Sequence, residues 1–132
     1  MPLTAAAEEV SADAARLPIH QIASYLQEHL GQRMTAYVSG IRDTKMVSHW
    51  IARRNVPRDQ AQLRLREAYQ VARLLVDAYG DETAKAWFTG SNAKLGDRAP
   101  AYVLRSARAW EELRDVLPLA RAFATERARA AR

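Results

Sequence analysis

The residues with the most evident binding chemistry lie in the stretch Asp43–Pro57, DTKMVSHWIARRNVP. The acid and hydroxyl at its start and the proline at its end predict a helix of about three turns over residues 44–54. Helical spacing puts Val47, Trp50 and Ile51 on one face. The opposite face carries donors of the kind that meet base edges and phosphates. These residues are Thr44, Lys45, Ser48, His49 and Arg53.

Residue types that serve catalysis are present, but their spacing does not fit a known chemistry. His20, His29 and His49 have no histidine partner one helical turn away and no acid at zinc-site spacing. The glycine-rich stretch 90–96 lacks the Gly-Lys-Ser/Thr of a phosphate-binding loop. Ser39 lacks the strand–turn–helix context of a hydrolase nucleophile. We therefore expect no catalytic residue, no metal and no cofactor, and hence no enzyme.

The composition is that of a globular protein. The 132 residues are 48% hydrophobic and 27% charged, enough for one compact domain or two small lobes that share a core. The lack of cysteine excludes a disulfide scaffold and a thiolate metal site, and it suits a reducing compartment. The first residues do not read as a signal peptide, and no apolar run would span a bilayer. We expect a cytoplasmic protein without a membrane partner.

Positive charge is concentrated in the middle of the chain. The net charge is +5, and residues 31–66 hold eight Lys or Arg against two acids. Such a block attracts a phosphate backbone, and the attraction weakens as salt rises. An arginine-rich solvated surface with no partner explains the same charge, so charge alone leaves both interpretations open.

The whole chain is predicted to be helical, because no alternating run of β-branched residues is bounded by hairpin turns. The longest element is a central core helix that follows Pro57 and ends at Gly80. The stretch TGSNAKLGDRAP, residues 89–100, predicts an ordered turn or loop. The other expected helices cover residues 5–15, 18–30, 34–40, 44–54, 81–88, 101–108, 109–117 and the segment from Pro118 onward.

Residues 34–54 predict a helix-turn-helix. Ala36 is small where two helices cross, and Gly40 can adopt a turn conformation that a side chain resists. Ile41, Val47 and either Trp50 or Ile51 are expected in the shared core. The candidate DNA-binding residues are then Arg42, Thr44, Lys45, Ser48, His49, Arg53 and Arg54, with Arg58 as a further phosphate contact. The same geometry also occurs in bundles that bind no DNA.

Two stretches together resemble a family of bacterial antitoxins. MTAYVSGIRDTKMVSHWIARRNVP resembles the Xre-type helix-turn-helix, and AKAWFTGSNAKLGDRAPAYVL resembles the toxin-binding domain of MbcA/ParS/Xre antitoxins. The second motif has a tryptophan that ends a helix, a loop, and a proline that opens the next helix. Its residues here are Trp87, Asn92, Leu95, Gly96 and Pro100. The resemblance covers about residues 18–118.

The chain departs from this pattern at one position that matters for a helix start. Ala99 precedes Pro100 and has no side-chain oxygen with which to cap a helix, so Asp97 becomes the candidate cap. The stretches before residue 18 and after Pro118 have no part in the motif.

The resemblance implies an all-α antitoxin that is not itself an enzyme. Its partners are a RES-domain toxin, which degrades NAD, and operator DNA, bound as a homodimer that represses its own operon. We expect an N-terminal extension (1–17), a helix-turn-helix domain with the central helix (18–79), and a toxin-binding domain with a tail (80–132). The candidate toxin-binding residues are Ser91, Asn92, Lys94, Arg98, Arg121, Arg127 and Arg129, with Arg132 in the same tail.

Simpler interpretations accompany each motif. Trp87 and Leu95 can be core residues, Gly96 and Pro100 can serve turn geometry, and the Ala/Arg tail can be a solvated end. For the whole chain, one alternative is a stand-alone Xre-type regulator whose C-terminal half only dimerises. Another is a family member whose helix-turn-helix no longer reads DNA and serves as a dimer scaffold.

Overall fold

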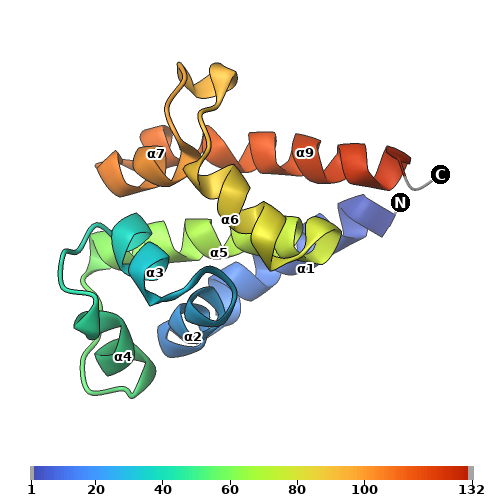
Figure 1. Ribbon diagram of the computed structural model, residues 1–132. Coiled ribbons are helices and arrows are strands. Elements are labelled where there is room, and N and C mark those ends of the chain that lie inside the picture. Colours follow the sequence, from blue (N-terminus) through green and yellow to red (C-terminus); the bar gives the residue numbers. More distant parts are fainter. Residues whose placement is uncertain (1, 131–132) are drawn as a thin grey trace.

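The computed structural model describes the backbone of residues 2–130 and the side chains of residues 7–130 (Figure 1). Within that range the regular secondary structure is helical, with a single isolated bridge between Asn92 and Arg98 and no strand, so the all-α prediction is confirmed. The helices are α1 (Pro2–Arg16), α2 (Ile19–Leu30), α3 (Gln32–Ser39), α4 (Lys45–Ile51), α5 (Asp59–Tyr79), α6 (Asp81–Thr89), the short 3-10 turn η1 (Ala93–Leu95), α7 (Pro100–Ser106), α8 (Trp110–Leu113) and α9 (Val116–Ala130).

Helix α5 is the centre of the fold. Its apolar residues recur every three or four positions, and Leu65, Ala68, Ala72 and Leu75 are fully buried. Helices α1, α2, α3, α6 and α9 all pack against it, as Figure 1 shows for the green helix crossing the molecule. One continuous hydrophobic core therefore joins the two halves of the chain.

The N-terminal segment belongs to this core. Val10 and Ala14 of α1 are buried against the rest of the core, and the guanidinium of Arg66 donates to the carbonyl oxygens of Ala14 and Leu17, both at 2.8 Å. An arginine that bonds the last carbonyls of a helix also opposes the negative end of the helix dipole. The segment expected as an extension thus has a fixed position on α5.

The C-terminal helices differ from expectation in their boundaries. The helix expected over residues 109–117 is the short α8, and Val116 and Leu117 already belong to α9. Pro118 lies in the first turn of α9, where the missing N–H of a proline has no helical partner to lose. Ala120 and Ala124 are buried, so the first part of the segment expected as a tail is a packed helix. The helix continues to Ala130, but residues 126–130 are exposed.

Two further arginines hold helix ends together. Arg64 donates to the carbonyl oxygen of Ser39 at the end of α3 and to that of Ala107 beyond α7. Arg105 of α7 donates to the carbonyl oxygens of Tyr37 and Ile41. Arg64 and Arg66 are therefore members of the basic block that face the protein rather than solvent.

A carboxyl group is buried in the core beside these helices. Glu67 of α5 is only 2% exposed, and its Oε2 accepts no hydrogen bond within the described chain. Its Oε1 accepts a long bond of 3.4 Å from Gln70. Burial raises the pKa of Glu67 to about 7, against the opposing effect of the positive charge of Arg121.

Candidate DNA-binding surface and protruding loop

Helices α3 and α4 are joined by the tight turn that the sequence predicts. Gly40 ends α3 in a left-handed conformation, with φ of 91° and ψ of 9°. A methyl group at Gly40 would lie 2.5 Å from Nη1 of Arg64, so a side chain there would displace the guanidinium that bonds the carbonyl of Ser39. The carboxylate of Asp43 accepts the backbone N–H of Lys45 at 3.0 Å and thereby caps α4.

The inner face of α4 is the expected one. Val47 and Trp50 are buried in the core, while Ile41 and Ile51 are partly buried against it. Helix α4 packs on both α2 and α3. Because this face is fixed by packing, the orientation of the opposite face is fixed as well.

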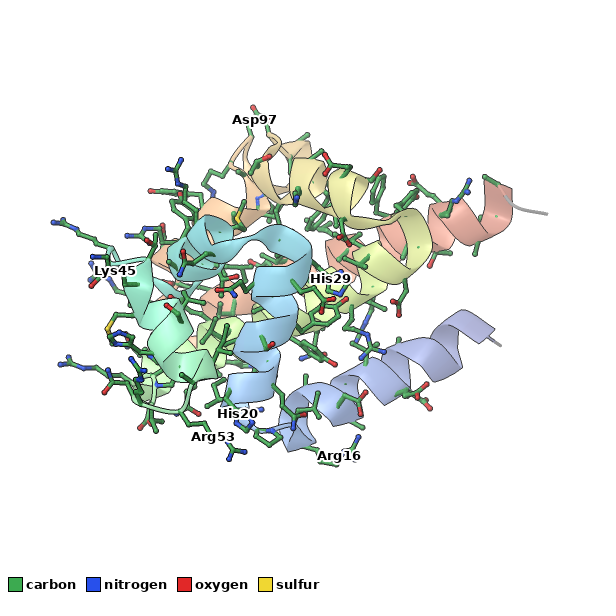
Figure 2. The ribbon with its side chains drawn as sticks, turned by 60° about the horizontal axis from the view of Figure 1, so that its bottom comes forward. Arg16, His20, His29, Lys45, Arg53 and Asp97 are labelled. Atoms are coloured by element: carbon green, nitrogen blue, oxygen red, sulfur yellow. The ribbon has the colours of Figure 1, made fainter. Side chains whose placement is uncertain are left out.

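That opposite face carries the polar residues. Lys45 and Ser48 are exposed, and Thr44 and His49 are half-buried. Ser48 Oγ donates to the carbonyl oxygen of Lys45 and accepts a weak bond from Gln32 of α3. Figure 2 shows Lys45 on the outer side of α4.

Arg53 and Arg54 follow α4 and are not part of its last turn, because α4 ends at Ile51 rather than at residue 54. The N–H of Arg53 bonds the carbonyl of Trp50 and the N–H of Arg54 bonds that of His49, the pattern of a Schellman end. Arg53 takes the left-handed position of that motif, with φ of 64°. The expected helix was too long because arginine occupies a position where glycine is the usual stop signal.

The side chain of Arg53 turns back toward α2. Its Nε and Nη2 lie 3.3 and 3.1 Å from Nε2 of His20, and Figure 2 shows the two side chains meeting below α4. Arg53 therefore does not continue the row formed by Lys45 and Ser48. The structure brings together the remaining candidates on the turn and on α4, which are Arg42, Thr44, Lys45, Ser48 and His49.

The segment between α6 and α7 is an ordered, protruding loop. Asn92 and Arg98 pair through the N–H of Asn92 and the carbonyl of Arg98, which closes the loop at its base. Gly96 and Asp97 both have positive φ, 66° and 64°, between Leu95 and Arg98, as in a tight type I′ turn. Figure 1 shows the loop rising above α6 and α7, away from α4.

The side chains of the loop divide into an internal and an external set. Leu95 is buried and anchors the loop, and Asn92 Oδ1 caps η1 by accepting the N–H of Lys94. Ser91, Lys94 and Arg98 are exposed. Asn92 therefore shapes the loop, and two of the exposed residues do so as well, because Ser91 Oγ donates to the carbonyl of Asp97 at 2.9 Å and Arg98 Nε donates to that of Leu95 at 2.7 Å. Of these three exposed residues in the described chain, Lys94 is the one whose side chain has no such bond.

Asp97 does not cap α7. It occupies the left-handed turn position, and no side chain caps the helix at Ala99. The extended backbone of Ala99 leads directly into Pro100, whose fixed φ suits the first position of a helix. The expectation that Asp97 replaces a missing cap was wrong because the proline already starts the helix.

Trp87, near the end of α6, contacts an aromatic residue of α9. Its ring stacks against Phe123 of α9, with centroids 6.4 Å apart, and meets the ring of Phe88 edge-on at 6.0 Å. Phe123 also stacks on Tyr79 at 4.5 Å. This aromatic cluster fixes the end of α6, from which the loop emerges, against α9.

The arginines of α9 lie apart from the loop. Arg121, Arg127 and Arg129 are exposed, and α9 runs away from the loop toward the N-terminus of α1 (Figure 1). Arg121 lines a groove of about 670 Å³ between α1 and α9. The loop and the end of α9 do not form one surface, and Arg132 lies outside the described residues.

A groove between α3 and α7 was missed by the sequence analysis. Its apolar part, about 420 Å³, is lined by Leu30, Met34 and two exposed tyrosines, Tyr37 and Tyr102. An adjoining basic part of about 240 Å³ shares Tyr37 and Arg33 with it. The two helices are far apart in sequence, so no local spacing signals the groove.

The described part of the chain holds neither a metal-binding cluster nor a helix suited to a membrane. Among residues 2–130 there is no cluster of three His, Cys, Asp or Glu residues that would hold a metal ion. No helix in the same range is long and apolar enough to cross a membrane.

Comparisons of the chain with models of protein families, with curated protein sequences and with solved structures found no match.

Proposed function

We propose that this chain is an antitoxin that binds DNA through α3 and α4 and neutralises a RES-domain toxin through the loop between α6 and α7. The observation that carries this proposal is the separation of two ordered, differently built surfaces on one rigid core (Figure 1). A protein with both surfaces can hold operator DNA and a toxin at the same time. It acts by binding and needs no catalytic group or cofactor.

The DNA-binding half of the proposal rests on the geometry of α4. A helix that packs through Val47 and Trp50 presents Lys45 and Ser48 outward, as a recognition helix presents side chains to the major groove. Lysine suits the acceptors of guanine, and a hydroxyl can bond either a base or a phosphate. We place this function in the cytoplasm, with the protein as a homodimer on paired half-sites.

The toxin-binding half rests on the loop. Ser91, Lys94 and Arg98 stand on a frame closed by the Asn92–Arg98 pair and anchored by Leu95, so little order has to be gained on binding. The resemblance implies that this domain blocks the active site of the toxin. Lys94 and Arg98 carry positive charge, which suits an acidic patch beside that active site.

The test compares loop and tail variants against the toxin. The protein encoded beside this chain is purified, its consumption of NAD is measured, and the inhibition constant of this chain is determined. The pair Lys94→Ala and Arg98→Ala should weaken inhibition, whereas Arg127→Ala and Arg129→Ala, on the far part of α9, remove the same charge as a matched control. Loss of inhibition from the α9 pair alone would move the toxin contact to the tail.

A stand-alone Xre-type regulator is the second candidate. It is favoured by one observation, that the α3–α4 unit is fully packed and capped without any contribution from the loop. In that case the neighbouring protein consumes no NAD, or this chain has no effect on it. Sequence-selective binding to upstream DNA would remain, with a steep dependence on salt.

A further inference from the structure

Three arginines line the basic part of the groove between α3 and α7. Arg33 comes from α3, Arg42 from the turn before α4, and Arg105 from α7. The hydroxyl-bearing Thr44 lines the same hollow, and no acidic residue does. Three like charges gathered without an acid produce a strongly positive potential, which favours an anion.

Arg105 is held in place before any ligand binds. Its Nη1 donates to the carbonyl oxygens of Tyr37 and Ile41, at 2.8 and 3.2 Å, and its guanidinium lies 4.8 Å from the centre of the Tyr37 ring. These hydrogen bonds use Nη1 of the planar guanidinium, whereas Nε and Nη2 have no partner in the described chain. A fork fixed in this way loses little side-chain entropy when it binds an oxyanion.

Arg33 and Arg42 supply the adaptable part of the site. Both are exposed, and neither forms an ion pair or a side-chain hydrogen bond within the described residues. The adjacent acid, Asp43, is already engaged with the backbone N–H of Lys45. Both side chains are thus available to a ligand that enters the hollow.

We infer that Arg33, Arg42, Arg105 and Thr44 form a phosphate-binding site at the junction of the helix-turn-helix and α7. A phosphate offers oxygens in the geometry that guanidinium forks bind bidentately. The chemistry has two possible sources, a backbone phosphate of DNA lying beside α4, or a free phosphate ester whose apolar part rests on Tyr37 and Tyr102. The first source rests on the proposed DNA-binding function, and the second does not.

The site is tested with the full chain and two kinds of probe. The first probe is duplex DNA, from the upstream region and of scrambled sequence, bound at several salt concentrations. Arg33→Ala and Arg42→Ala should each weaken binding to both duplexes by roughly 3–10-fold and should reduce the salt slope by about 1. Arg114→Ala removes the same charge from an exposed position elsewhere and should leave the slope unchanged.

The second probe is inorganic phosphate, followed through the NMR signals of the arginine Nε–H groups, with AMP as the ester. Shifts confined to Arg33, Arg42 and Arg105 support the site even if the chain binds no DNA, in which case the DNA proposal alone fails. The site is overturned if the Arg33 and Arg42 variants bind DNA like the control and phosphate shifts none of the three signals. If Lys45→Ala still weakens DNA binding in that case, the DNA proposal stands. Absence of both DNA binding and phosphate shifts overturns both.

Discussion

At the scale of single residues, Arg53 shows how one side chain decides where α4 ends. Its φ of 64° is a conformation that residues other than Gly, Asn and Asp rarely adopt, and the hydrogen bonds of the Schellman end hold it there. Its contacts with His20 are exposed, so they contribute little stability in return.

Replacing Arg53 by glycine should therefore stabilise the protein. Relief of the left-handed strain exceeds the greater chain entropy of glycine, and we expect the free energy of unfolding to rise by about 0.5–1 kcal/mol. Urea denaturation measures the change. Arg54→Gly is the matched control, since Arg54 has no positive φ, and it should be neutral or destabilising. A destabilised Arg53→Gly variant would mean that the contact with His20 matters more than the strain.

Glu67 makes stability depend on pH. Because its pKa is about 7 in the folded chain against 4.5 for the unperturbed group, folding takes up a proton between these values. The free energy of unfolding should therefore fall as pH rises from about 4.5 to about 7, and should level off above that range. The stability is present below the unfolded pKa and is lost as pH rises through the folded pKa.

Glu67→Gln should remove this dependence. The neutral amide resembles the protonated acid, so the variant should exceed the parent protein by about 1–3 kcal/mol at pH 8 and match it near pH 4. Thermal unfolding across this pH range measures the difference, with Glu9→Gln on the exposed face of α1 as control. Parallel pH profiles for the Glu67 variant and the parent would contradict the argument.

At the scale of elements, α4 and the loop are expected to act independently. Lys45→Ala should weaken binding to operator DNA by about 1–3 kcal/mol if the lysine contacts bases, and should leave toxin binding unchanged. Lys94→Ala removes the same side chain from the loop. It should weaken toxin binding and leave DNA binding unchanged. Fluorescence anisotropy with DNA and calorimetry with the toxin measure both. No loss of DNA binding from Lys45→Ala would favour the interpretation of α3 and α4 as a scaffold.

The loop depends on its buried anchor. Leu95→Ala removes buried apolar contacts, and we expect a local loss of about 2–3 kcal/mol, because truncating a buried leucine leaves a cavity or lets the loop open. Hydrogen exchange should accelerate at the bonded amides of Asn92, Asp97 and Arg98 while those of α5 stay protected. Toxin inhibition should fall together with this protection. Lys94→Ala should leave the exchange rates unchanged, and acceleration throughout the chain would show that the loop is not a separate unit.

At the scale of the whole molecule, much of the fold was predictable because local signals are strong. The apolar period of α5 and the glycines at 31, 40 and 80, all with φ near +90°, gave the correct elements. The end of α4 was not predicted because Arg53 adopts the left-handed conformation that ends the helix, a position where glycine is usual. The start of α9 was missed because proline fits any position of a first turn, not only the first residue.

The candidate site was predictable only in its local parts. Helical period alone placed Lys45 and Ser48 outward, since Val47 and Trp50 had to be buried. The hollow formed by Arg33, Arg42 and Arg105 depends on α3 and α7 meeting, which no spacing in sequence reveals. The separation of the α9 arginines from the loop likewise required the path of α9.

We propose that the loop between α6 and α7 neutralises a toxin that consumes NAD. The most direct measurement is the rate of NAD consumption by the purified protein encoded beside this chain, with this chain added in increasing amounts. We predict that consumption stops at a stoichiometric ratio for the parent protein and for Lys45→Ala, and persists for the Lys94→Ala, Arg98→Ala pair. A neighbour that consumes no NAD, or one whose rate is unaffected by this chain, would contradict the claim.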